Sequence, residues 1–332
     1  MLSSTLSDQQ LEPGARANPQ PEGALIQGFA ADMALALASR PRSISPKYFY
    51  DAEGSRLFDR ICELPEYYPT RTELGILTTH AGEIAAQIGP RAEMVEFGAG
   101  SCVKVELLLA AMEQPARYLP IDISGEHLAA AAAELRRKFP DLDVQPVVAD
   151  YTQRLRLPAQ PAGAGRRVGF FPGSTIGNFT PPEALQFLEA TGQALRGGVL
   201  LLGADLVKEP SMLHAAYSDA QGVTAAFNLN LLARANRELG TDFVLEQFAH
   251  SAFYNAPLQR IEMHLVSRCR QHVTHAGRCH EFEEGETLHT ENSYKFTIDG
   301  LRALAARAGF SPGPVWTDPA RLFSLHWLQA PQ

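Results

Sequence analysis

The chain has 332 residues, of which 29 are Lys or Arg and 37 are Asp or Glu, so its formal net charge at pH 7 is −8. At about 100–200 residues per domain, this length predicts two domains or one domain with a large addition. Apolar residues make up 45% and charged residues 20%, which is typical of a globular protein with a sizeable core. The acidic balance argues against a nucleic-acid-binding protein, because that class is expected to carry a basic face.

The cysteines and the first residues of the chain indicate its compartment. Four cysteines without CxxC spacing are too few for a disulfide scaffold and fit a reducing compartment. The first residues lack the basic segment and the following apolar segment of a secretory signal. The apolar stretch 29–38 is interrupted by Asp32 and is too short to span a membrane. We therefore expect a cytoplasmic protein that binds neither membranes nor nucleic acid.

The beginning of the chain divides into a tail and a segment dense in motifs. Residues 1–24 are rich in Pro, Gly, Gln and Ser, which predicts a flexible tail. Residues 25–39 have helical spacing, and residues 47–73 combine many aromatic and turn-forming residues. Aromatic residues in loops either fill the core or line a pocket. We assign residues 25–71 to the first part of a lobe that surrounds a central domain.

Strands and helices alternate in the next part of the chain, residues 72–207. Strands are predicted at 94–97, 118–123, 144–148, 168–171 and 199–203, with helices at 103–112, 124–138 and 181–195. This βαβα order predicts an α/β domain with a parallel sheet covered by helices. Right-handed crossovers place the loops that follow the strands along one edge of the sheet, where ligands bind.

The regular alternation ends after Lys208. Helices are predicted within 211–239 and at 301–308, and strands within 260–273, from 288 and at 322–328. Because this block has no βαβ order of its own, we assign residues 208–332 to the second part of the surrounding lobe.

A short glycine turn follows the first strand of the central domain. Gly98, Ala99, Gly100 and Ser101 lie between this strand and a helix. Glycines let the backbone approach a ligand closely, and a helix N-terminus offers free N–H groups. The dinucleotide fingerprint requires a third glycine where this chain has Val103, which argues against a nicotinamide-dependent dehydrogenase. S-adenosylmethionine (SAM) has no pyrophosphate, so a shorter turn suffices for it.

Two acidic residues end the next two strands. Asp122 can accept hydrogen bonds from ribose hydroxyls, and Asp150 can accept one from an adenine amino group. Taken singly, each aspartate is as well explained by a helix cap or a solvated loop. Together with the glycine turn, their positions resemble those of the class I SAM-dependent methyltransferases.

The loop after the fourth strand is the expected place for a methyl acceptor. Its residues run from Gly173 to Asn178, and Thr175 stands where a nucleophile elbow requires serine. The Asn178 side chain can both donate and accept hydrogen bonds. A plain turn residue is the alternative interpretation of Asn178.

Several long segments carry a more specific resemblance. They are KYFYDAEGSRLFDRICELPEYYPTRTE, GSTIGNFTP, LLGADLVKE, AAYSDAQGVTAAFNLNLLARANREL, RIEMHLVSR and HTENSYKF. In this order they resemble the histidine Nα-methyltransferases of ergothioneine biosynthesis, over residues 46–327 or so. The resemblance implies a Rossmann-like class I methyltransferase domain with a second, substrate-binding lobe built from the N-terminal and C-terminal segments. It also implies three methyl transfers from SAM to L-histidine, which give the betaine hercynine.

The resemblance also assigns roles to individual residues. It places the substrate imidazole against Tyr67, Met263, Glu291 and Ser293. It places the carboxylate against Asn178 and Tyr217, and the α-amino group against Tyr50, Asn178 and the backbone carbonyl of Gly173. It assigns SAM to Gly98, Gly100, Ser101, Lys104, Asp122, Asp150 and Tyr151. Tyr50 and Asn178 are the candidates for catalysis. The chain departs from the family at Ala99, which replaces a serine, so that a cofactor contact is either lost or moved to Ser101.

Other functional classes remain as alternatives. A methyltransferase of the same family could act on another amino acid or small amine, and a silent binding module could keep the fold without the reaction. His272, His275, Cys279 and His280 lie close together in the sequence, but without the usual zinc spacing, so we expect no metal. The resemblance implies a monomer.

Overall fold

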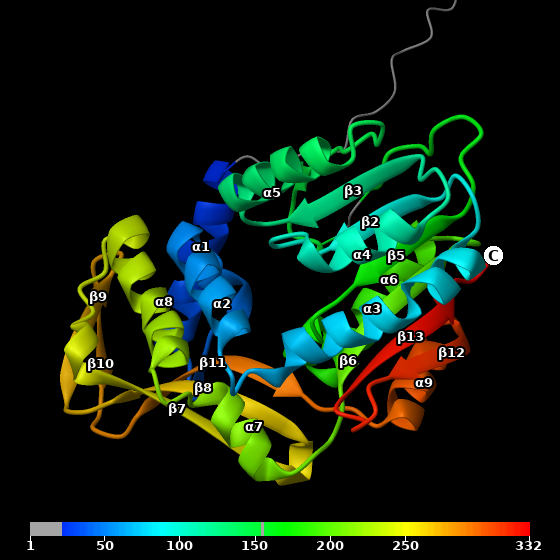
Figure 1. The fold of residues 1–332 in the computed structure, drawn as a ribbon. Helices are drawn as coiled ribbons and strands as arrows, with labels where there is room; N and C mark the ends of the chain where they lie inside the picture. Colours follow the sequence, from blue (N-terminus) through cyan, green and yellow to red (C-terminus); the bar gives the residue numbers. More distant parts are fainter. Residues whose placement is uncertain (1–21, 154–155) are drawn as a thin grey trace, which may run out of the picture.

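The computed structural model describes residues 22–153 and 156–332, which form two lobes (Figure 1). Strands β12-β13-β6-β5-β2-β3-β4 form a seven-stranded sheet in one lobe. Strands β1-β11-β8-β7 form a four-stranded sheet in the other, next to the hairpin β10-β9. Most of the expected tail lies outside the described residues, but helix α1 (Glu22–Ala38) already begins within it. None of the described helices has the length and apolar character of a membrane span.

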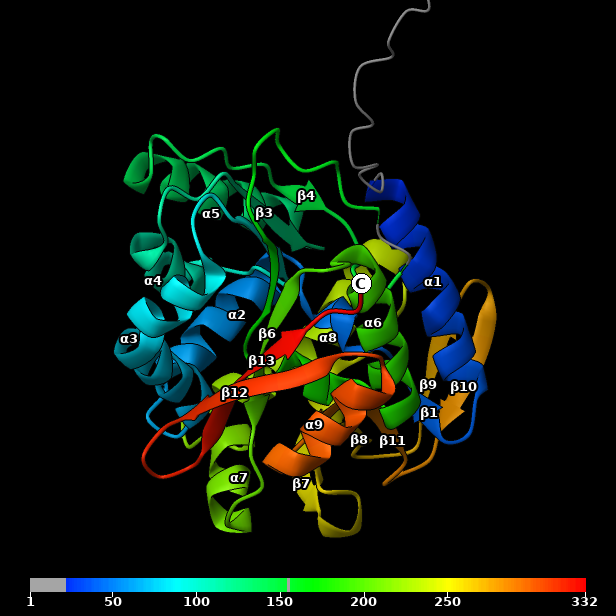
Figure 2. The same ribbon diagram turned by 90° about the vertical axis from the view of Figure 1, so that its right-hand side faces the viewer.

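The lobe with the seven-stranded sheet contains the predicted alternation of strands and helices. Its elements are α3 (Tyr68–Ile88), β2 (Glu93–Phe97), α4 (Val103–Ala111), β3 (Arg117–Asp122), α5 (Gly125–Lys138), β4 (Val147–Val148), β5 (Arg167–Phe171), η2 (Thr175–Asn178), α6 (Pro181–Ala194), β6 (Val199–Asp205), α9 (Ile298–Arg307), β12 (Ser311–Thr317) and β13 (Phe323–Gln329). Strands β2 and β6 are buried along their whole length, as expected for parallel strands that helices cover on both faces (Figure 2).

The order and direction of the strands confirm the Rossmann-like α/β fold. Strands β6, β5, β2, β3 and β4 are parallel neighbours, and β13 is antiparallel to both β6 and β12. Helix α6 begins where the sequence places it, because Thr180 and Glu183 form a capping box and Pro181 stands at its first position.

The assignment of residues 208–332 to the surrounding lobe is wrong in its last part. Helix α9 and strands β12 and β13 belong to the seven-stranded sheet and its covering layer, because β13 pairs with β6 from Phe323 to Gln329. Strand β12 has no counterpart among the predicted strands. It contains Pro312 and Pro314, and proline cannot donate to a ladder, so such a strand is tolerated only at the edge of a sheet.

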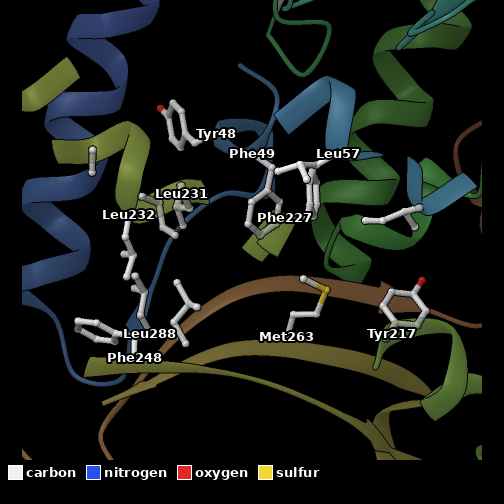
Figure 3. Packing of buried hydrophobic residues seen from close by; sticks show 14 of the residues in the cluster. Tyr48, Phe49, Leu57, Tyr217, Phe227, Leu231, Leu232, Phe248, Met263 and Leu288 are labelled. Atoms are coloured by element: carbon white, nitrogen blue, oxygen red, sulfur yellow. The ribbon is translucent and has the colours of Figure 1, made fainter. Parts of the chain in front are cut away.

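The second lobe joins segments that are far apart in the sequence. Its elements are α1, β1 (Arg42–Ser43), η1 (Pro46–Phe49), α2 (Ala52–Glu63), α7 (Pro210–Tyr217), α8 (Val223–Leu239), η3 (Leu245–Gln247), β7 (Phe248–Asn255), η4 (Ala256–Leu258), β8 (Arg260–Ser267), β9 (Gln271–His275), β10 (Arg278–Phe282) and β11 (Thr287–Tyr294). One core unites them, and in it the ring of Phe49 of η1 packs at a tilt against that of Phe227 of α8, above Met263 (Figure 3). Burial of such side chains stabilises the lobe by about 1.5–3 kcal/mol each.

Two close contacts of the backbone fix one lobe against the other. The segment that follows β6 lies beside the segment that follows β11. Phe296 N–H donates to Asp205 O (2.9 Å), and Val207 N–H donates to Phe296 O (3.0 Å). A Cβ atom at Gly177 of η2 would lie 2.7 Å from the carbonyl oxygen of Tyr294, so only glycine allows η2 to approach β11 this closely. The ends of the parallel strands therefore face the second lobe.

Candidate active site

The glycine turn and Asp122 form the first part of the site. Gly98 and Gly100 have φ angles of 71° and 50°, a region that glycine adopts without strain. The Asp122 carboxylate accepts hydrogen bonds from Gly100 N–H (3.1 Å) and Ser124 N–H (2.9 Å). Burial raises the pKa of Asp122, and these N–H donors oppose the shift. Asp122 thus holds the turn in place and still has lone pairs for a ligand, whereas Ser101 is exposed.

Asp150 and Tyr151 lie beside this turn, at the end of β4. The Tyr151 ring lies close to Gly98, where a Cβ atom would approach it to 3.4 Å. The Asp150 carboxylate accepts from Thr152 N–H (2.9 Å) and pairs with Lys47 Nζ (3.1 Å). Lys47 belongs to η1 of the second lobe, so this carboxylate also links the two lobes.

Lys104 of α4 is paired with a buried carboxylate. Its Nζ pairs with Glu73 Oε2 (2.7 Å), and the same oxygen accepts from Gly173 N–H (2.8 Å). Burial lowers the pKa of Lys104, but Glu73 outweighs that effect and raises it above its ordinary value. Lys104 and Glu73 thus hold the start of the loop that carries Gly173 and Asn178.

Tyr50 and Tyr67 stand in an aromatic cluster of the second lobe. The Tyr50 ring packs edge-on against Phe58 (5.6 Å between centroids) and Phe227 (5.7 Å). Tyr67 packs edge-on against Phe58 (6.2 Å) and Tyr217 (6.4 Å). Burial raises the pKa of Tyr50, and the negative charges of Glu291 and Asp122 raise it further. Tyr50 is therefore close enough for the charges of both Glu291 and Asp122 to act on its hydroxyl group.

Glu291 and Met263 lie side by side on neighbouring strands. They are register partners across β11 and β8, at a point where the ladder shifts between His289 and Glu291. Burial raises the pKa of Glu291 to about 7, although the charge of Lys295 favours the ionised form. Within the described part of the chain, no side chain donates a hydrogen bond to this carboxylate. Glu291 can therefore serve as an acceptor or, once protonated, as a donor for a bound ligand.

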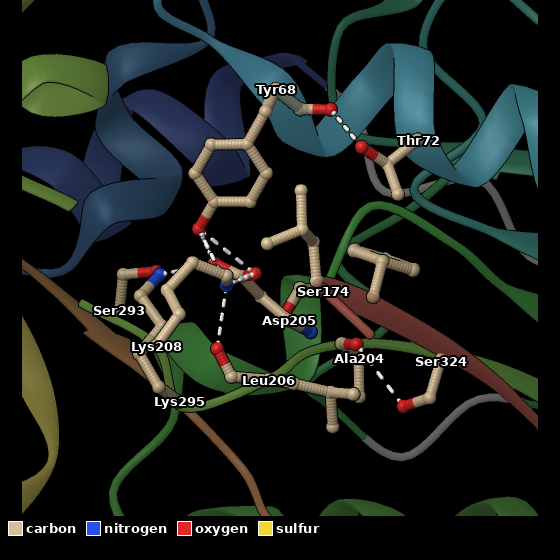
Figure 4. A network of polar contacts seen from close by, with 12 residues as sticks. Tyr68, Thr72, Ser174, Ala204, Asp205, Leu206, Lys208, Ser293, Lys295 and Ser324 are labelled. Carbon is tan, nitrogen blue, oxygen red and sulfur yellow. Dashed lines mark hydrogen bonds and ion pairs between the residues drawn. The ribbon is translucent and has the colours of Figure 1, made fainter. Parts of the chain in front are cut away.

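Tyr217 and Ser293 are joined to each other and to the buried ammonium group of Lys295, which Figure 4 shows beside Ser293 and Asp205. Their hydroxyl oxygens are 2.6 Å apart. Lys295 Nζ donates to Ser293 Oγ (2.7 Å) and to Tyr217 OH (3.1 Å), and it pairs with Asp205 Oδ2 (2.9 Å). Asp205 also accepts from Tyr68 OH (2.7 Å) and pairs with Lys208. The end of β6 thus supports two of the expected substrate residues.

The structure links Tyr67 with Tyr217, Tyr217 with Ser293, and Glu291 with Met263, whereas no contact joins the Asn178 side chain to this group in the described part of the chain. It also adds residues that the sequence interpretation missed. The additions are Lys47, Glu73, Tyr68, Asp205, Lys208 and Lys295. All lie inside the quoted motifs or beside an assigned residue, such as Tyr68 next to Tyr67 and Lys295 two positions after Ser293. Their place in the motifs was the available indication, but burial and pairing become visible only once the two lobes are folded together.

The histidine cluster that was considered for a metal is a hairpin. On β9, His272 is exposed and the Nε2 atom of His275 lies 3.1 Å from the Ala30 carbonyl, so the two side chains face opposite sides as predicted. A different group, Glu262, His264 and His289, has ligand atoms within 4.8 Å of one another. The His264 and His289 rings are stacked 4.6 Å apart, so their nitrogen lone pairs run side by side and do not converge. Arg260 already pairs with Glu262 (2.7 Å), and we assign no metal to this group.

Comparison with known proteins agrees with this geometry. A glycine turn after the first strand and acids at the ends of the next two strands are the pattern of a SAM-dependent methyltransferase. The family described as "Histidine-specific methyltransferase, SAM-dependent" matches residues 29–330, and the chain belongs to this family.

Relatives with curated names span most of the chain. It is 44% identical to the histidine N-alpha-methyltransferase of Mycolicibacterium smegmatis, over 90% of this chain and 94% of that protein. It is 42% identical to the enzyme of the same name from Mycobacterium tuberculosis, over 89% of this chain and 92% of that protein. It is also 29% identical to "Ergothioneine biosynthesis protein 1" of Neurospora crassa, over 87% of this chain and 33% of that longer protein.

Proposed function

We propose that the protein transfers three methyl groups in succession from SAM to the α-amino nitrogen of L-histidine. The product is hercynine, and the reaction is the first step of ergothioneine biosynthesis. The observation that carries this proposal is the half-buried carboxylate of Glu291, which lies beside Met263 and near Ser293 and the Tyr67 ring. None of residues 22–153 and 156–332 donates a hydrogen bond to it. A carboxylate in such surroundings favours a ring that carries nitrogen. The identity of 44% to a named histidine N-alpha-methyltransferase supports the same substrate.

The donor set at the strand ends fits SAM. Asp122 and Asp150 offer carboxylate oxygens, the acceptors that ribose hydroxyls and an adenine amino group require. Gly98 leaves the space of a side chain open beside the Tyr151 ring, where a Cβ atom would approach to 3.4 Å. Gly98, Gly100, Ser101, Asp122, Asp150 and Tyr151 would hold the cofactor, with Lys104 acting through Glu73. When bound, SAM supplies an electrophilic methyl group on a sulfonium centre.

Substrate recognition divides between the two ends of histidine. The imidazole would contact Glu291, Ser293, Tyr67 and Met263, and the carboxylate would contact Asn178 and Tyr217. A neutral imidazole has one donor and one acceptor nitrogen. A site built to pair such a group rejects an analogue without it by up to about 10⁴. Histidine is therefore preferred over phenylalanine.

The main contribution of the protein to methyl transfer is alignment. Asn178 and the Gly173 carbonyl would orient the amine lone pair toward the strand ends, and such positioning is worth up to about 7–11 kcal/mol. The amine must be neutral to attack, and a nearby cation disfavours its protonated form. Burial raises the pKa of Tyr50, with Glu291 adding to the shift, so its hydroxyl stays protonated and can anchor a water chain. Its ring face can lie against the growing quaternary ammonium.

The test is direct. Purified protein is incubated with SAM and L-histidine, and product masses are read over time. A product three methyl groups heavier, with the fragmentation of a betaine, supports the proposal. If histidine remains unchanged while SAM binds, the substrate proposal fails, and a screen of other amino acids and amines follows.

We further propose that the enzyme works as a monomer in the cytoplasm, where its four free cysteines, one of them exposed, remain reduced.

A further inference from the structure

Lys295 lies behind the two hydroxyl groups that face the proposed substrate. It follows β11 directly, and its side chain is 1% exposed. Its ammonium group contacts Asp205 Oδ2 (2.9 Å), Ser293 Oγ (2.7 Å) and Tyr217 OH (3.1 Å). A lysine ammonium has three N–H donors and no acceptor. These three contacts therefore use every donor of Lys295 and leave none for a ligand.

Lys295 stays protonated despite its burial. Burial alone lowers the pKa of this group, but Asp205 and Tyr217 outweigh it and raise the pKa above its ordinary value. Asp205 is held in turn by Tyr68 OH (2.7 Å) and by Lys208. Lys295 is thus a fixed donor, and toward it Tyr217 and Ser293 can act only as acceptors.

A count of protons limits what the two hydroxyls can offer. Tyr217 and Ser293 each carry one O–H hydrogen. Their oxygens are 2.6 Å apart, so one hydrogen lies in the bond between them. Because Lys295 accepts nothing, exactly one O–H of the pair can point to a substrate. The order of the pair then decides which residue donates to it.

We propose that Lys295 is a positioning residue that holds both hydroxyl oxygens in the order that the substrate carboxylate selects: Ser293 donates to Tyr217, Tyr217 donates to the substrate carboxylate, and Ser293 offers the imidazole only a lone pair. This inference rests on the proposed function, because it uses the two ends of histidine as partners. A carboxylate can only accept hydrogen bonds, so Tyr217 must donate its O–H hydrogen to the substrate carboxylate. The ring nitrogen beside Ser293 must then carry a hydrogen. Lys295 thereby excludes rings that present only an acceptor at that position.

Two thiazole analogues of histidine test the inference. In 4-thiazolylalanine and 5-thiazolylalanine, an acceptor nitrogen occupies one or the other imidazole nitrogen position, and neither ring carries an N–H. Binding of histidine and of both analogues is measured by calorimetry with S-adenosylhomocysteine present. The wild type should prefer histidine over both analogues. In Lys295→Met, the Ser293 hydroxyl is free to turn and to donate to an acceptor nitrogen. The preference for histidine over the thiazole isomer whose nitrogen faces Ser293 should therefore fall about tenfold, which corresponds to one hydrogen bond.

Lys208→Met is the matched control. Lys208 is also bound to Asp205, but it donates to Tyr68 OH and the Leu206 carbonyl and not to Tyr217 or Ser293. Its removal should leave the preference ratios as in the wild type. If Lys295→Met lowers affinity for all three ligands in the same proportion, Lys295 has only a structural role and the inference fails.

A second variant keeps the test independent of the folding of Lys295→Met. Tyr217→Phe removes the acceptor of the Ser293 hydrogen and keeps the aromatic ring. The affinity for the same thiazole isomer should therefore rise relative to the affinity for histidine. Unchanged ratios in Tyr217→Phe would also overturn the inference. Failure of the proposed function is distinguishable, because the wild type would then form no hercynine and show no preference for histidine.

Discussion

At the scale of single residues, the chemistry depends on carboxylates in different surroundings. Asp122 is held by the backbone N–H groups of Gly100 and Ser124, and Asp150 is paired with a lysine of the other lobe. Glu291 instead lies where burial raises its pKa to about 7 and where no donor of the described chain reaches it. The first two are therefore prepared to accept from hydroxyl and amino groups, whereas the third can exchange a proton with its ligand near neutral pH.

Replacement of Glu291 should separate substrate binding from cofactor binding. We expect Glu291→Ala to weaken histidine binding by about 10²-fold, because an imidazole nitrogen loses its hydrogen bond to the Glu291 carboxyl group. Calorimetry should show unchanged affinity for S-adenosylhomocysteine. Equal losses for both ligands would mean that Glu291 does not contact the imidazole.

Replacement of Asp122 should have the opposite effect. Asp122→Ala removes the proposed ribose acceptor and the acceptor for Gly100 N–H, so cofactor affinity should fall at least tenfold. Fluorescence or calorimetric titration with S-adenosylhomocysteine measures this loss, with Glu126→Ala on the exposed side of α5 as control. An unchanged cofactor affinity would remove Asp122 from the site.

At the scale of elements, the predictable parts were those with a local cause. Strand β6 begins with a run of apolar residues, and helix α6 has its own capping box, so neither needs the rest of the fold to be recognised. Strand β12 was missed because its prolines oppose a strand, and β10 because its exposed polar residues show no clear alternation. Position in the folded sheet, which a local pattern does not contain, decides both cases.

The same distinction applies to the site. Gly98, Asp122 and Asp150 follow from the rule that ligands bind at the ends of parallel strands. The lysine–aspartate pair of Lys295 and Asp205 does not follow from any local pattern, because its members come from different lobes. Residues that hold the substrate residues in place are harder to predict than the substrate residues themselves.

Strand β2 carries a buried acid whose titration should affect stability. Burial raises the pKa of Glu96 to about 8, although the Tyr118 hydroxyl, which donates to it, favours the ionised form. The folded protein thus retains a proton that the unfolded chain, with the ordinary value of 4.5, has lost. The free energy of unfolding should therefore fall as pH rises from about 4.5 to about 8, by at most about 1.4 kcal/mol per pH unit.

The variant Glu96→Gln resembles the protonated acid and has no proton to lose. Its melting temperature should exceed that of the wild type by an amount that grows between pH 5 and pH 8, the window set by the two pKa values above. Glu113→Gln, on the surface, serves as the control. A difference that does not change with pH would contradict a raised pKa for Glu96.

At the scale of the whole molecule, the proposed site belongs to neither lobe alone. Few polar contacts cross between the lobes near the cofactor residues, among them Lys47 with Asp150 (3.1 Å) and Ser55 Oγ with Ser124 Oγ (3.4 Å). The ligands would add contacts to both sides. Binding of one ligand should therefore favour binding of the other.

We expect the two lobes to close when both ligands are bound. Small-angle scattering should show a smaller radius of gyration with S-adenosylhomocysteine and histidine than without ligands, and Lys47→Met should reduce the coupling between the two affinities. Identical scattering of the free and doubly bound protein would exclude a large closure. Scattering with S-adenosylhomocysteine alone shows which ligand drives the change.

The position of β13 in the sheet has a consequence for synthesis on the ribosome. Strand β6 is wholly buried and apolar along most of its length, and the strand that covers its outer side is made only after all of the second lobe. Until then β6 is a nascent edge with unpaired N–H and C=O groups, a template for aggregation. Premature termination before Phe323 should thus yield chains that require a chaperone, however complete their ligand-binding residues are.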